Sequence, residues 1–140
     1  MKIKSKVYEK LIGCPKVPPE MVGILAGRNS IIDDVIFDIG KTECRAGITY
    51  VPDVKFLNLC LLNLYHAQKG LLGIFHTHAY IWDSLSYEDK MYIDTIMRAM
   101  PPEIDLLYFP LVFPGCSVKS FKAIRDKSQI RIMEDKIKVL

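Results

Sequence analysis

Two histidines separated by one residue are the most chemically informative feature of the chain. His76 and His78 come directly after the apolar run 71–75, which follows Lys69 and Gly70. The run is rich in strand-forming residues, and the preceding Lys-Gly pair is typical of a helix end, so we expect a buried strand here. Because alternate residues of a strand point to the same face, both imidazoles should project together at its end.

A serine and an aspartate follow at a spacing that suits the same site. Ser86 comes after seven intervening residues, and Asp89 lies three residues further on. Their types predict a helix start, with Ser86 as the cap and Asp89 in the first turn. Through the short loop, Asp89 can reach back to the strand end. Two imidazoles and a carboxylate are a natural ligand set for zinc, so we expect one zinc ion per chain on His76, His78 and Asp89, with water in the fourth position.

Such a centre predicts a metal-dependent hydrolase. Zinc lowers the pKa of a bound water to about 7, which makes hydroxide available at neutral pH. Attack on an amide also requires a general base and a group that stabilises the oxyanion. Ser86 is well placed to donate a hydrogen bond to the oxyanion. Asp83 and Glu88 lie nearby but have no evident anchor, so the base must come from another element.

The elements that must position these residues alternate along the chain, which predicts a mixed α/β domain around one sheet. The tail, 129–140, is ambiguous between a pair of strands and a helix. Between the histidine strand and the next helix, 79–85 is expected to be a loop. Hydrophobic periodicity and turn residues predict helices over 5–12, 52–69 and 86–100, and strands over 21–27, 35–39, 47–51, 71–77, 104–113 and 117–124.

Length and composition are those of an ordinary globular domain. The 140 residues, half of them hydrophobic and a quarter charged, predict one compact domain. The net charge of +3 is small and the basic residues are dispersed, which argues against nucleic-acid binding. The apolar runs are too short to span a bilayer, and the N-terminal residues lack the pattern of a signal peptide. We therefore expect a cytoplasmic protein that does not enter the membrane.

The remaining candidate residues predict little chemistry. The four cysteines, at positions 14, 44, 60 and 116, form no C-x-x-C pair, which argues against a zinc ribbon or a thioredoxin-type site. Cys60 is expected in the core. His66 is expected on an exposed helix face. The glycines form neither of the usual phosphate-binding loops.

The motif formed by the two histidines, the serine and the aspartate resembles that of a known family, the JAMM metalloproteases. These are the catalytically competent MPN (JAB1/MPN/Mov34) domains. The segment 20–27 is similar to the family's E-x-x-G-x-L-x-G segment, whose glutamate is the general base. The resemblance therefore assigns that role to Glu20. The family signature H-x-H-x(7)-S-x(2)-D is matched at every fixed position, by His76, His78, Ser86 and Asp89.

The resemblance implies a fold as well. It implies an α/β domain that is JAMM-like (cytidine-deaminase-like), with a mixed, mostly antiparallel curved sheet flanked by helices. It covers residues 1–125, and 126–140 would be a C-terminal extension packed on the same domain. One departure is Ala79, where the family often has proline; the apolar loop that follows contains Tyr80 and Trp82, which are candidate substrate contacts. The short chain is similar to minimal prokaryotic-type members.

The resemblance further implies a zinc-dependent peptidase or isopeptidase. Its substrate would be an amide bond after the C-terminal tail of a ubiquitin-like or sulfur-carrier protein, cleaved by water that Glu20 activates on the metal. The tail would bind extended, as an added strand beside the site. Two alternatives stay open: a non-catalytic, zinc-stabilised protein-interaction module, and a metal-dependent hydrolase of small amides.

Overall fold

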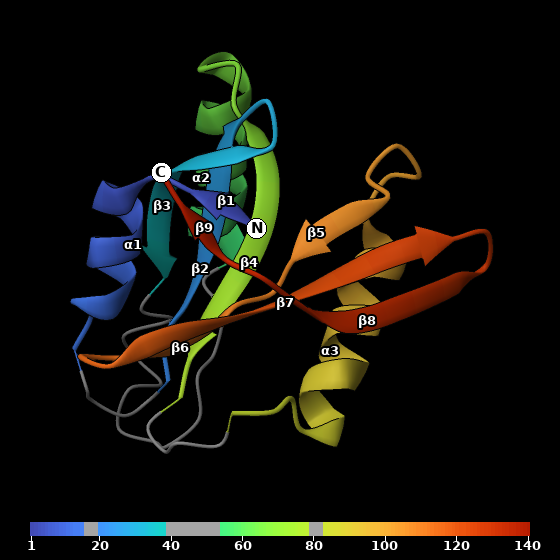
Figure 1. Cartoon of the computed structure of the whole chain (residues 1–140). Coiled ribbons are helices and arrows are strands. Elements are labelled where there is room, and N and C mark those ends of the chain that lie inside the picture. The colour runs from blue at the N-terminus through green and yellow to red at the C-terminus, as the bar shows by residue number, and fades with distance from the viewer. Residues whose placement is uncertain (16–19, 39–53, 79–82) are drawn as a thin grey trace.

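The computed structural model describes residues 1–15, 20–38, 54–78 and 83–140. They form a mixed α/β fold, as expected, with a mostly antiparallel and partly parallel sheet (Figure 1). The helices of this part are α1 (Ser5–Ile12), α2 (Val54–His66) and α3 (Tyr87–Ala99). The strands are β1 (Lys2–Ile3), β2 (Val22–Arg28), β3 (Ile31–Asp38), β4 (Gly70–Thr77), β5 (Leu106–Tyr108), β6 (Leu111–Phe113), β7 (Ser117–Asp126), β8 (Gln129–Asp135) and β9 (Lys138–Val139).

The strand that carries the histidines lies in the middle of the sheet. The strand order is β5-β7-β6-β4-β2-β3-β1-β9, and β8 pairs with β7. On one side β4 pairs antiparallel with β2, and on the other it pairs parallel with β5 and β6. Because β4 has neighbours on both sides, its position is determined by two sets of backbone hydrogen bonds.

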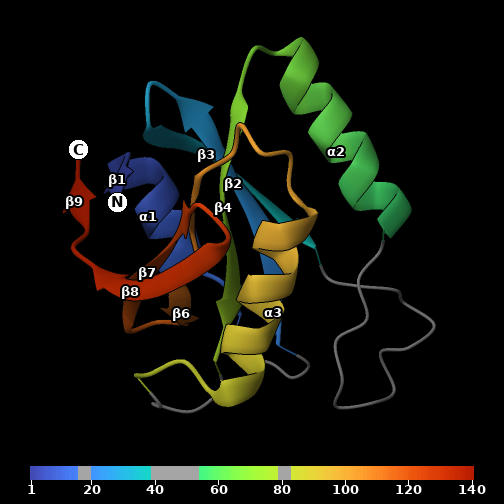
Figure 2. The ribbon, with the colours of Figure 1, turned by 90° about the vertical axis from the view of Figure 1, so that its right-hand side faces the viewer.

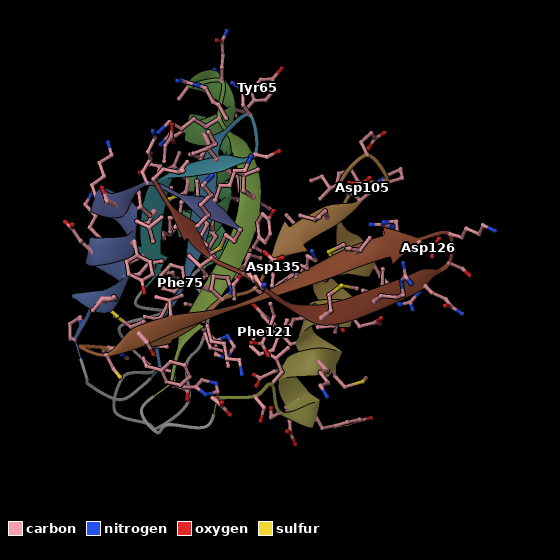
Figure 3. The ribbon with its side chains drawn as sticks, viewed as in Figure 1. Tyr65, Phe75, Asp105, Phe121, Asp126 and Asp135 are labelled. Carbon is pink, nitrogen blue, oxygen red and sulfur yellow. The ribbon has the colours of Figure 1, made fainter. Side chains whose placement is uncertain are left out.

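The two faces of the sheet are covered by different helices. Along β2, Leu25 belongs to the core cluster that contains α1, whereas Ile24 and Ala26 pack against α2. Figure 2 shows α1 on one side of the sheet and α2 and α3 on the other. Phe75 is part of the α1 core and Phe121 part of the α3 core; both are labelled in Figure 3.

Two expectations need correction. The single strand expected over 104–113 is divided into β5 and β6, with Phe109 and Pro110 between them. Proline has no backbone N–H, so Pro110 interrupts the ladder although its carbonyl accepts from the His76 N–H. The expected strand 35–39 begins earlier, at Ile31. The strand expected over 47–51 lies outside the described residues.

The residues after 125 complete the same sheet. β7 turns back at Lys127, whose φ of 56° is left-handed, and β8 pairs with it antiparallel from Gln129 to Asp135. β9 then pairs with β1 at the far edge. The ambiguous tail is thus strand, in two pieces with different partners, and no part of it is helical. In the described ranges, no helix is both long and apolar enough to cross a membrane.

A glycine makes room for the aromatic residue that anchors β4. Phe75 is fully buried, pairs with Gly23 across β2 and β4, and contacts Phe37 edge-on at a centroid distance of 5.4 Å. A Cβ on Gly23 would lie 2.4 Å from the Phe75 ring and 2.3 Å from the Ile36 carbonyl oxygen. Since the carbonyl belongs to the backbone of β3, it cannot move aside without disturbing the pairing.

We therefore expect Gly23→Ala to destabilise the fold by about 1–3 kcal/mol through overpacking. Gly70→Ala is the matched control, because a Cβ there would have its nearest neighbour at 3.9 Å. The control should change the free energy of unfolding by no more than about 0.5 kcal/mol. Urea unfolding of the three proteins measures both values, and equal stability of Gly23→Ala and the wild type would contradict the packing described.

Candidate metal centre

The backbone of residues 76–78 is held from both sides. The His76 N–H donates to the Pro110 carbonyl at 3.3 Å, and the His78 N–H donates to the Val112 carbonyl at 2.9 Å. Between them, the Thr77 N–H donates in the opposite direction, to the Met21 carbonyl at 2.8 Å. The two histidines therefore share one face of the sheet, the face covered by α2 and α3, as the strand alternation predicted.

The helix start brings an aspartate to the same place. Ser86 and Asp89 form a reciprocal capping box: the Asp89 N–H donates to Ser86 Oγ at 3.0 Å, and the Ser86 N–H donates to Asp89 Oδ2 at 2.8 Å. This occupies Oδ2 and leaves Oδ1 facing His76. The capping function expected of Ser86 and Asp89 is confirmed.

The three candidate ligand groups converge. His76 Nε2 lies 2.9 Å from His78 Nε2 and 3.2 Å from Asp89 Oδ1, and His78 Nε2 lies 4.0 Å from Asp89 Oδ2. In a tetrahedral zinc site, bonds of about 2.0–2.1 Å separate neighbouring ligand atoms by about 3.3 Å. The observed distances bracket this value. These residues are therefore close enough to bind a metal ion, and a set of two nitrogens and one oxygen suits zinc and leaves room for a fourth ligand.

Asp89 is also in the right charge state. The hydrogen bond with His76 and those with Ser86 lower the pKa of Asp89 well below its usual range, although partial burial opposes the shift. The carboxylate is therefore ionised at neutral pH, as a metal ligand must be.

Glu20 lies two residues before β2, the strand that pairs with the histidine strand. It immediately precedes Met21, which is hydrogen-bonded to Thr77, and Val22 pairs with His76. If the extended backbone of β2 continues back through Met21, Glu20 shares the face of Val22 and the histidines. Its side chain is exposed, as access to a reacting water would require.

The sequence also made predictions for four further residues. Tyr80 and Trp82 lie outside the described residues. His66 is exposed at the end of α2, as expected, and Cys60 is buried in the core.

One neighbour of the site had no sequence signal. Phe113 meets the His78 ring edge-on at a centroid distance of 6.1 Å and so limits its rotation. Only the pairing of strands far apart in the chain brings Phe113 to the site.

An apolar groove lies on the same face of the sheet as the two histidines. It has a volume of about 200 Å³ and runs between α2 and α3 over β2 and β4. Val22 and Ile74 form part of its floor. Val22 pairs with His76 across the two strands, and Ile74 lies two residues before His76 on β4. Leu57, Leu61 and Tyr92 contribute its walls.

Comparison with known proteins shows the fold alone. No family model and no curated protein matches the chain. The solution structure of a protein from Desulfitobacterium hafniense is similar, with a TM-score of 0.64 and 18% identity over 99% of this chain and 92% of that one. A second solution structure, of a protein from Salinibacter ruber, gives a TM-score of 0.55 and 16% identity over 98% and 90%.

Metal binding is directly testable. We expect zinc at 100 times its dissociation constant to stabilise the protein by about 2.7 kcal/mol. Asp89→Asn should lose most of this gain, because the amide is a poor zinc ligand although its oxygen still accepts from the Ser86 N–H. Asp94→Asn on the same helix, where Asp94 instead pairs with Arg98 at 2.7 Å, should retain it. Thermal unfolding with and without zinc measures the difference, and equal zinc effects in both variants would rule out Asp89 as a ligand.

Proposed function

We propose that this chain is a zinc-dependent peptidase or isopeptidase of the JAMM type, with the JAMM-like fold that this implies. The observation that carries the proposal is the convergence of His76, His78 and Asp89 within 4.8 Å of one another, next to the strand that begins after Glu20. The match to the JAMM signature at every fixed residue adds to this support.

Each residue then has a role. His76, His78 and Asp89 would hold the metal, which supplies Lewis-acid activation of water and of the scissile carbonyl. Glu20 takes the proton from the attacking water and returns it to the leaving amine. Ser86 Oγ accepts the Asp89 N–H, so its own hydroxyl proton is available to the oxyanion of the tetrahedral intermediate.

The groove offers a place for one apolar side chain of a substrate tail. Its floor and walls are mostly apolar, and its volume of about 200 Å³ is below the roughly 300–1,000 Å³ of pockets that enclose a whole small ligand. We therefore assign the groove to an apolar side chain near the C-terminus of a ubiquitin-like or sulfur-carrier protein.

Glu20→Gln tests the catalytic part of the proposal. Loss of the base should lower kcat by about 100- to 10,000-fold, because proton transfer contributes that much to such reactions. Zinc affinity should not change, since Glu20 is not a ligand. Glu88→Gln is the matched control, an exposed carboxylate beside Asp89 that should retain full activity. Cleavage of linear and branched ubiquitin-like and sulfur-carrier fusions, followed by mass spectrometry, is the measurement.

A chelator separates the proposal from a binding module. Cleavage should stop when zinc is removed and return when it is restored. A wild-type protein that binds a fusion only with zinc, yet cleaves none of the substrates, would make this chain a zinc-stabilised interaction module instead. Cleavage restricted to dipeptides and amino-acid amides would favour the small-amide hydrolase.

A further inference from the structure

We infer that Thr77, the residue between the two histidines, is a positioning residue that sets Glu20 over the metal centre. The inference rests on the proposed function, in which Glu20 is the base. It assigns Thr77 a task distinct from both neighbours, because its side chain points to the opposite face of the sheet and touches neither the metal ligands nor the groove.

The contact that carries the inference is a buried side-chain hydrogen bond. The Met21 N–H donates to Thr77 Oγ1 at 2.8 Å, and the Thr77 N–H donates to the Met21 carbonyl at 2.8 Å. Thr77 is only 4% exposed. In a regular antiparallel pair the Met21 N–H would bond to the Thr77 carbonyl. Here the hydroxyl accepts it, so the side chain completes the last cross-strand pair of β2 and β4.

This hydrogen-bonded pair is adjacent in the sequence to both the proposed base and the candidate ligands. Glu20 is attached directly to Met21, and His76 and His78 are attached directly to Thr77. The Met21 side chain is 9% exposed and packs in the α1 core, which fixes the position of Met21 on the face opposite the histidines. For Glu20 itself, the described residues show no side-chain hydrogen bond. Its location relative to the histidines therefore depends on Met21 staying paired with Thr77.

Threonine meets both requirements of this position. Its methyl group suits a buried site, and its hydroxyl supplies the acceptor that the Met21 N–H needs. Valine has the same shape but no acceptor, so Thr77→Val would remove the oxygen that the Met21 N–H uses in this structure and shift Met21 relative to the strand end. Thr77→Ser keeps the hydroxyl and loses only the methyl group.

The kinetic test compares these two variants. Thr77→Val should lower kcat on the order of 10- to 100-fold with little change in KM or zinc affinity, because a misplacement of about 1 Å costs roughly 100-fold. Thr77→Ser should restore most of kcat. Ser120→Ala is the matched control: Ser120 is equally buried, at 1% exposure, but its hydroxyl contacts Met1 Sδ at 3.7 Å. If kcat falls by the same factor per unit of lost stability in Thr77→Val and in Ser120→Ala, Thr77 is merely structural and the inference fails.

A second measurement needs no substrate. With Co²⁺ in the site, pseudocontact shifts in NMR spectra report the location of the Glu20 amide relative to the metal. They should be large in the wild type and in Thr77→Ser, and reduced by averaging in Thr77→Val, while those of α3 stay unchanged. Unchanged Glu20 shifts in Thr77→Val would overturn the inference. A wild-type protein that cleaves nothing would remove the proposed function, but these shifts would still decide whether Thr77 positions Glu20.

The wild-type protein alone gives a further check. The Met21 amide should exchange with solvent as slowly as the Thr77 amide, because both are buried in the same pair. Rapid exchange at Met21 alone would exclude the hydroxyl contact, even if Thr77→Val does not fold.

Discussion

The site depends on a strand that is hydrogen-bonded on both sides up to its last residue. The N–H groups of His76 and His78 donate to Pro110 and Val112, just before and within β6, and the Thr77 N–H donates to Met21, just before β2. A strand bonded to two neighbours cannot slide or rotate without breaking several bonds at once. The Cα positions of both histidines are therefore set by the sheet before any metal binds. Binding then needs to order only side-chain rotamers, which keeps its entropic cost low.

The third candidate ligand group is positioned by helix capping, and the cap and the contact with His76 use different atoms of one carboxylate. Oδ2 of Asp89 accepts from the Ser86 N–H, while Oδ1 faces His76. Because the cap stabilises the first turn of α3 in its own right, the carboxylate stays in place without a metal. A bound ion would replace the contact with His76 and leave the cap intact. The cap then acts as the outer hydrogen bond that orients a metal ligand.

The parts of the site that sequence reasoning predicted are those with local signals. Strand alternation predicted that the histidines share a face, and the serine-aspartate spacing predicted the start of α3. The contacts it missed join segments far apart in the chain. Nothing local shows that Phe113 lies against His78 or that Met21 pairs with Thr77. The end of the tail is a similar case, because β9 takes its register from β1, at the other end of the chain.

The orientation of the site is determined by a residue that takes no part in its chemistry. Side chains alternate along β4, so a shift of register by one residue would turn both histidines into the α1 core. Phe75 prevents this, because it is fully buried over Gly23 and contacts Phe37, and such a shift would take its ring out of the α1 core. Burial of a phenylalanine side chain is worth about 1.5–3 kcal/mol. That exceeds what the two partly exposed imidazoles contribute without a metal, so the apolar core, rather than the ligands, decides which way the ligands point.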